Sequence, residues 1–183
     1  HLHLHLLDLY VYLRQNLSLS KRELEKAGLE RLLADAFPQN TPQLCYTDKG
    51  KPYLDKCEKF ISVSHAHRYL ALLVNDKEET GVDIELLRDK VQNIRHKFLN
   101  EQENAFAGND NESLICLWAA KEALYKVDGQ KELRFKEDLV VEPYTNPDHI
   151  TGYILRPGQK RKFVLVSERI EDYILVYVLH EVR

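Results

Sequence analysis

The sequence has 183 residues, of which 44% are hydrophobic and 30% charged, and carries a formal net charge of −3. This length suffices for one sizeable core or for two small halves that share one, and the composition is ordinary for a soluble globular protein. The weak negative charge gives no global case for nucleic-acid binding, no apolar run approaches the ~20 residues of a membrane span, and the amino end has no signal-peptide pattern, so we expect a cytoplasmic protein.

The first part of the chain predicts one amphipathic helix among strands. Ser20 opens the helix, because Glu23 follows it by three residues in the pattern of a capping box, and Pro38 ends it. The strand-like runs are residues 1–13, with Leu2, Leu4 and Leu6 on one face, and residues 43–47, 60–64 and 69–75.

The second part predicts a strand at TGVDIEL, helices over about 89–107 and 110–127, and then antiparallel strands. The second helix closes near Gly129, and the later strands are DLVVEPY, ITGYILR, KFVLVSE and YILVYVLHEV. This order of elements predicts an α+β fold of two similar halves, with antiparallel sheets and packed helices. We expect residues 1–77 to form the amino-terminal half and residues 78–183 the carboxy-terminal half.

The sulfur-containing residues give two further expectations. Cys45, Cys57 and Cys116 are odd in number and lack CxxC spacing, which favours buried free thiols over disulfides or structural zinc. The sequence contains no methionine, so we expect either a fragment of a longer chain or a sequence without its selenomethionine positions.

Two acidic residues interrupt the hydrophobic stretch TGVDIE. In a strand, Asp83 and Glu85 share one face, roughly 6 to 7 Å apart, and Val82 and Ile84 point the other way. Acids that alternate with hydrophobic residues usually mark the solvated face of an edge strand. A divalent cation is the alternative reason for two like charges to face each other.

A stripe on the long helix carries another acid. Trp118, Glu122 and Lys126 are four residues apart and therefore neighbours on one face. An exposed Glu122–Lys126 pair, worth a few tenths of a kcal/mol, explains the last two, whereas Trp118 indicates that the stripe faces protein. Glu122 would join Asp83 and Glu85 as a third hard oxygen ligand for Mg²⁺, and Lys126 could meet a phosphate.

Two more polar clusters have both a bland and a functional explanation. In SVSHAHR, Ser64 and His65 could donate to a phosphate near Lys51 of the preceding GKP, and an incidental surface loop explains the residues equally well. In IRHKFLNEQE, a basic run precedes Glu101 and Glu103. That pattern is typical of a solvated helix face, and a surface that docks an acidic partner is the alternative.

The motifs occur in the order GKP, SVSH, GVDIE and WAAKEALYK, which resembles the 4′-phosphopantetheinyl transferases, specifically their larger, two-halved type. The resemblance covers roughly residues 48–130, and the pairing of GVDIE with WxxKExxxK is its most specific part. It implies Mg²⁺-dependent transfer of the 4′-phosphopantetheine arm of coenzyme A to a serine of an apo acyl or peptidyl carrier protein. It also implies release of 3′,5′-ADP and a chain that acts as a monomer; the charge and hydropathy already predict no nucleic-acid and no membrane partner.

The resemblance also implies roles for individual residues. The implied metal ligands are Asp83, Glu85 and Glu122. The implied coenzyme A contacts are Lys51, Ser64, His65 and Lys126, the first three at the nucleotide end with its 3′-phosphate. The implied catalytic residues are Glu122, Lys126 and Glu103, the last assisting deprotonation of the serine, with Glu101 as the alternative if the register differs by two.

The sequence departs from the family where the usual Asn-Ile-Ser-His-Ser is replaced by SVSHA, which loses one donor. Two other functions therefore stay open. A metal-dependent phosphohydrolase or nuclease could use the same acids, and a non-catalytic relative could bind coenzyme A or a carrier without turnover.

Overall fold

A computed structural model describes residues 1–13, 18–130 and 132–183. The amino-terminal strands are β1 (Leu2–Asp8), β2 (Leu44–Tyr46), β3 (Pro52–Leu54), β4 (Phe60–Ala66) and β5 (Tyr69–Asn75). The carboxy-terminal strands are β6 (Val82–Leu86), β7 (Leu139–Val141), β8 (Ile150–Arg156), β9 (Gln159–Ile170) and β10 (Tyr173–Val182). The helices are α1 (Leu9–Leu13), α2 (Lys21–Ala36), α3 (Val91–Phe98), α4 (Glu101–Ala107) and α5 (Asn111–Asp128).

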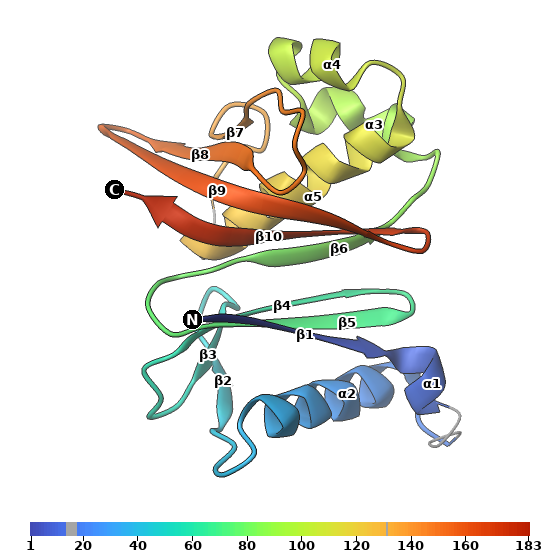
Figure 1. Ribbon diagram of the computed structural model, residues 1–183, viewed down its shortest axis with the longest axis vertical. Coiled ribbons are helices and arrows are strands. Elements are labelled where there is room, and N and C mark those ends of the chain that lie inside the picture. Colours follow the sequence, from blue (N-terminus) through green and yellow to red (C-terminus); the bar gives the residue numbers. More distant parts are fainter. Residues whose placement is uncertain (14–17, 131) are drawn as a thin grey trace.

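The strands form antiparallel sheets in the orders β1–β5–β4, β6–β10–β9–β8–β7 and β2–β3. Helix α2 covers the smaller of the two main sheets and α5 covers the larger one (Figure 1). The predicted α+β fold with antiparallel sheets and packed helices is therefore confirmed. In the described part of the chain, no helix is both long and apolar enough to cross a bilayer.

The amino-terminal half follows the sequence pattern except at β1 and β3. The side chain of Ser20 accepts a hydrogen bond from the backbone of Glu23, which completes the predicted capping box of α2. The predicted strand over residues 1–13 is wrong after Asp8, because Asp8 Oδ1 accepts from the backbone N–H of Tyr10 (2.9 Å) and so favours the turn into α1. Strand β3 lies between the predicted strands over 43–47 and 60–64, where no strand was predicted.

The carboxy-terminal half is built around α5, whose two ends were predicted correctly. Asp110 caps its start, and Gly129 ends it in the left-handed conformation with a φ of 64°. The region predicted to be helical over about 89–107 forms two helices, α3 and α4, because Asn100 leaves the helical conformation and forms a capping box with Glu103 that starts α4. Of the three cysteines, all free thiols, Cys116 is buried and the other two are half-buried.

The two halves meet along β4 and β6, which lie next to each other in the middle of the molecule (Figure 1). Ser62 Oγ accepts from the backbone N–H of Val82 (3.0 Å), and Ser64 Oγ accepts from that of Ile84 (3.3 Å). Serine side chains thus replace a backbone ladder at this junction. A buried hydrophobic cluster also spans it, and its members are Tyr69, Ala71, Leu73, Val82, Ile84, Tyr173 and Leu175.

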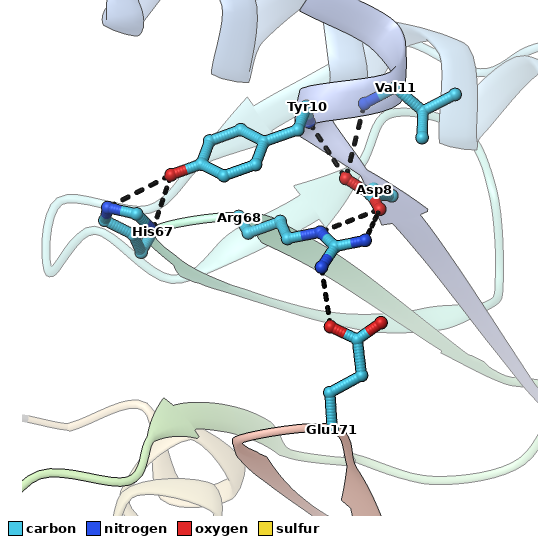
Figure 2. Close-up of polar contacts among 6 residues, drawn as sticks. All are labelled: Asp8, Tyr10, Val11, His67, Arg68 and Glu171. Atoms are coloured by element: carbon cyan, nitrogen blue, oxygen red, sulfur yellow. Dashed lines mark hydrogen bonds and ion pairs between the residues drawn. The ribbon is translucent and has the colours of Figure 1, made fainter.

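Arg68 joins the halves at one end of the junction, where two hairpin tips meet (Figure 2). Its guanidinium donates to Asp8 Oδ2 of β1 (2.8 Å from Nε) and to Glu171 Oε2 (2.5 Å), which lies at the β9–β10 turn. One cation therefore bridges an acid from each half, and the junction that carries the candidate site is held at its end as well as along its length.

Candidate functional site

Asp83 lies at the centre of the junction and is 4% exposed. Its Oδ1 accepts from Ser64 Oγ (2.8 Å) and from Lys126 Nζ (2.8 Å). Its Oδ2 is buried and has no hydrogen-bond partner among the described residues. A solvated edge-strand face does not describe this carboxylate, because a buried oxygen without a donor costs free energy unless a ligand or cation satisfies it.

Glu85 lies two residues further along β6 and is half-buried. Trp118 Nε1 donates to its Oε1 (2.9 Å), and the Trp118 ring packs against the rings of Phe98 and Phe135. The stripe of α5 therefore faces protein, as Trp118 indicated. Burial, and next the charge of Asp83, raise the pKa of Glu85.

Glu122 on α5 completes the group of acids. Burial raises its pKa to about 7, the charges of Asp83 and Glu85 add to the effect, and Lys126 opposes it. The three carboxylates are thus close enough to repel one another, so a cation between them would relieve that repulsion.

These carboxylates suit a hard cation in their chemistry. Mg²⁺ binds oxygen ligands and keeps several waters, so a site with one buried and two half-buried carboxylates fits it. Within residues 1–13, 18–130 and 132–183, no three His, Cys, Asp or Glu side chains already stand at ligand spacing. The orphaned Oδ2 of Asp83 is the observation that favours a cation here.

Lys126 connects the acids to a basic pocket between the halves. Its Nζ donates to the carbonyl oxygen of Val82 (2.9 Å) as well as to Asp83. The pocket has a volume of about 180 Å³, and its lining residues include Lys49, Lys51 and Lys126. Three lysines beside an acid group would suit a ligand that brings its own negative charge and binds together with a cation.

Lys51 is held at this pocket by the end of α5. Its Nζ donates to the carbonyl oxygen of Val127 (2.8 Å) and pairs with Glu79 (2.5 Å). The aliphatic part of the Lys51 side chain packs against Gly129, where an added Cβ would lie 2.3 Å from the Lys51 Cδ. Glycine therefore meets two demands there, a positive φ and a close approach.

Ser64 and His65 were expected to contact one nucleotide end together, but the structure separates them. Neighbouring residues of a strand point to opposite faces. The Ser64 hydroxyl lies at the junction, where it donates a hydrogen bond to Asp83 and accepts one from the N–H of Ile84. The His65 side chain is 53% exposed on the other face, with Nε2 3.5 Å from Glu25 Oε1. Ser64 therefore supports the acid group, and His65 alone is free to meet a ligand.

His65 opens onto a larger groove that was not predicted from the sequence. The groove has a volume of about 750 Å³ and runs between α2, β2 and β4, with Arg22, Lys26 and Tyr46 among its lining residues. Next to it, a cavity of about 410 Å³ is lined by His65, Glu85 and Trp118, among others. The pair Arg22 and Lys26, four apart on one face of α2, is the sequence signal that marks the groove.

Glu103 lies in the core rather than at the junction. It is 1% exposed, and its Oε2 pairs with Lys121 Nζ (2.7 Å), which is itself completely buried. Its Oε1 accepts from the backbone N–H of Val141 (2.9 Å), and Oε2 also accepts from that of Asn100 (2.9 Å). Both oxygens are engaged, so this geometry gives Glu103 a structural role and not the predicted one of taking a proton from a serine; Glu101, the alternative, is exposed.

Comparison with known proteins agrees with this arrangement. The model of the 4′-phosphopantetheinyl transferase superfamily matches residues 79–178, which include β6, α5 and most of the larger sheet. No curated protein sequence matches this chain significantly.

Proposed function

Because the chain belongs to the 4′-phosphopantetheinyl transferase superfamily, we propose that it is a larger, two-halved member that modifies carrier proteins. It transfers the 4′-phosphopantetheine arm of coenzyme A to a serine of an apo acyl or peptidyl carrier protein. The observation that supports the proposal is the buried Oδ2 of Asp83, which has no partner among the described residues and lies on a carboxylate that Lys126 Nζ contacts at 2.8 Å.

The reaction is a displacement at phosphorus. The serine oxygen attacks the β-phosphorus of coenzyme A, the bond from that phosphorus to the oxygen bridging it to the α-phosphorus breaks, and 3′,5′-ADP leaves. The serine gives up its proton in the process. Such a transfer depends on alignment of the attacking and leaving oxygens and on neutralising the charge of the pyrophosphate.

The residues of the junction divide this work. Asp83, Glu85 and Glu122 would hold Mg²⁺, which neutralises pyrophosphate charge when bound. Lys126 keeps one hydrogen bond on Asp83 and lies on the basic pocket, where it can steady the phosphate under attack. Lys51, which was predicted at the nucleotide end, lines this pocket and not the groove at His65, and it adds a second positive charge here. Because both halves contribute from one chain, the protein is proposed to act as a monomer.

The nucleotide end of coenzyme A is proposed to occupy the groove at His65. Its volume of about 750 Å³ is within the range of small-molecule sites, and the adjoining cavity at Glu85 and Trp118 leads toward the acids. Ser64 is reassigned from the nucleotide to the support of Asp83, since its hydroxyl is buried there.

The test is mass spectrometry of an apo carrier protein incubated with coenzyme A, Mg²⁺ and the enzyme. One arm per carrier serine is expected, and Asp83→Ala should lower the rate by orders of magnitude. Asp148→Asn, an acid on an exposed loop, is the matched control and should leave the rate unchanged. Turnover near the wild-type rate in Asp83→Ala would show that the acid group does not carry the reaction.

The same experiment separates the competing functions. A phosphohydrolase would release 3′,5′-ADP from coenzyme A without any carrier, and a non-catalytic relative would bind coenzyme A without forming product. Nucleotide release that requires the carrier is the result expected of the transferase.

A further inference from the structure

Glu25 is an acid in a groove where the family resemblance leads one to expect a phosphate. It lies on α2, lines the groove with His65, and its side chain is 23% exposed. Its Oε1 is buried and makes no hydrogen bond within the part of the chain that the structure describes. His65 Nε2 lies 3.5 Å from this oxygen, and Lys21 Nζ lies 3.8 Å from it.

The negative charge of Glu25 would repel a phosphate bound to His65. His65 Nε2 faces Glu25, so a phosphate that bound His65 would lie close to a second negative charge. Two like charges in contact near a protein surface repel each other, which weakens binding of the phosphate. A ribose hydroxyl has the opposite preference, because it donates a hydrogen bond to a carboxylate, as the acid of dinucleotide-binding folds does with a free 2′-hydroxyl.

The rest of the groove suits a nucleoside. Its floor is apolar and includes Leu29, Leu33 and Leu70, while Tyr46 stands at its edge with 59% of its surface exposed. Leucine and tyrosine side chains can pack against a flat aromatic ligand such as a purine. The unsatisfied Oε1 of Glu25 is then the acceptor that fixes the sugar.

We infer that the groove binds an adenosine whose ribose 3′-hydroxyl is free, with Glu25 as its acceptor, so that the protein favours 3′-dephospho-coenzyme A over coenzyme A. The inference rests on the proposed function. The displacement is otherwise the same: the serine oxygen bonds to the β-phosphorus, the bond to the bridging oxygen breaks, the serine proton is released, and the leaving group is 5′-AMP instead of 3′,5′-ADP.

Two basic residues in the groove define the opposing outcome. Arg22 and Lys26 are both exposed on α2. A 3′-phosphate held by them, away from Glu25, would favour coenzyme A and make Glu25 irrelevant to the choice.

The test is isothermal titration of the intact protein, in Mg²⁺, with coenzyme A and with 3′-dephospho-coenzyme A. The wild type should bind the dephospho form about tenfold more tightly, a typical result of one unfavourable charge contact. Glu25→Gln should bring the two dissociation constants close together, mainly by tightening coenzyme A. Glu30→Gln is the matched control, since Glu30 lies on the same helix and groove, is exposed, and loses the same charge; its ratio should equal that of the wild type.

Four results would count against the inference, and the last of them counts against the proposed function as well. Tighter binding of coenzyme A by the wild type overturns the inference even without any variant. An unchanged ratio in a folded Glu25→Gln, or an equal change in Glu30→Gln, overturns the role of Glu25. Failure of the wild type to bind either compound contradicts the proposed function itself.

Discussion

The buried pair of Glu103 and Lys121 gives a quantitative prediction for Glu103→Gln. Lys121 Nζ is 0% exposed and donates to Glu103 Oε2 and to the carbonyl oxygens of Phe98 (2.6 Å) and Phe135 (2.7 Å). The substitution removes the only carboxylate within salt-bridge distance of this ammonium among the described residues. It therefore leaves a buried positive charge with carbonyl dipoles alone.

The magnitude follows from that uncompensated charge. Breaking one side of a buried ion pair costs about 3–5 kcal/mol, a large part of the ~5–15 kcal/mol by which native proteins are stable. Burial already lowers the pKa of Lys121, and the charge of Glu103 is the main opposing effect. Without Glu103, Lys121 has to lose its proton or the surrounding core has to open.

Urea unfolding followed by circular dichroism measures the effect. With a slope of about 2 kcal/mol per molar urea, the midpoint of Glu103→Gln should fall by roughly 2 M. Glu101→Gln, an exposed acid on the same helix, is the control and should shift by less than about 0.5 kcal/mol. A loss below about 1 kcal/mol in Glu103→Gln would refute the reasoning.

The same variant tests the role of Glu103 in the reaction. Under conditions where it is folded, its kcat for arm transfer should stay within a few-fold of the wild type, because both oxygens of Glu103 are engaged by Lys121 and by backbone N–H groups in the core. A general base would instead contribute a factor of about 10²–10⁴. A loss of that size in fully folded protein would restore the catalytic role expected from the family.

Three other predictions concern the junction. Ser64→Ala removes a hydrogen-bond donor from Asp83 and should raise the Mg²⁺ concentration at half-maximal rate several-fold. A changed kcat with an unchanged Mg²⁺ dependence would contradict the role of Ser64 in supporting Asp83. Gly129→Ala should destabilise the protein by about 1–3 kcal/mol, because it combines a positive φ with a clash on Lys51. The comparison in urea unfolding is Gly158→Ala, which has a positive φ but open space around it. A neutral result for Gly129→Ala would refute the contact. The pKa of Glu122 is raised from 4.5 to about 7, so between these pH values the folded protein in EDTA keeps a proton on Glu122 that the unfolded chain has lost. The free energy of unfolding should therefore fall as the pH rises through this window. The fall should be smaller in Glu122→Gln, and equal slopes for the two proteins would contradict the raised pKa.

The local features of this fold could be predicted from the sequence because they depend on neighbours in the chain. The capping box at Ser20 and the left-handed end of α5 at Gly129 are set by residues within one turn. The same locality explains the errors. Asp8 and Asn100 each compete for nearby backbone N–H groups, and so end a strand and divide a helix that hydrophobic spacing alone would continue.

The sequence was enough to group the acids of the site, but it did not predict which residues from other segments contact them. Asp83, Glu85 and Glu122 could be grouped because a strand and a helix each fix the face on which their residues lie. The support of Asp83 by Ser64, the burial of Glu103 against Lys121, and the groove at Glu25 all depend on contacts between distant segments. No periodicity in the sequence reports such contacts.

The central claim is that acids from β6 and α5 hold one cation beside the pyrophosphate of the bound substrate. Its most direct test is a crystal structure with coenzyme A and Mn²⁺ in place of Mg²⁺, read from the anomalous difference map. The account predicts one peak within coordination distance, about 2.0–2.3 Å, of carboxylate oxygens of Asp83, Glu85 and Glu122 and next to the pyrophosphate. A pyrophosphate bound elsewhere, or a manganese peak away from these three side chains, would contradict it.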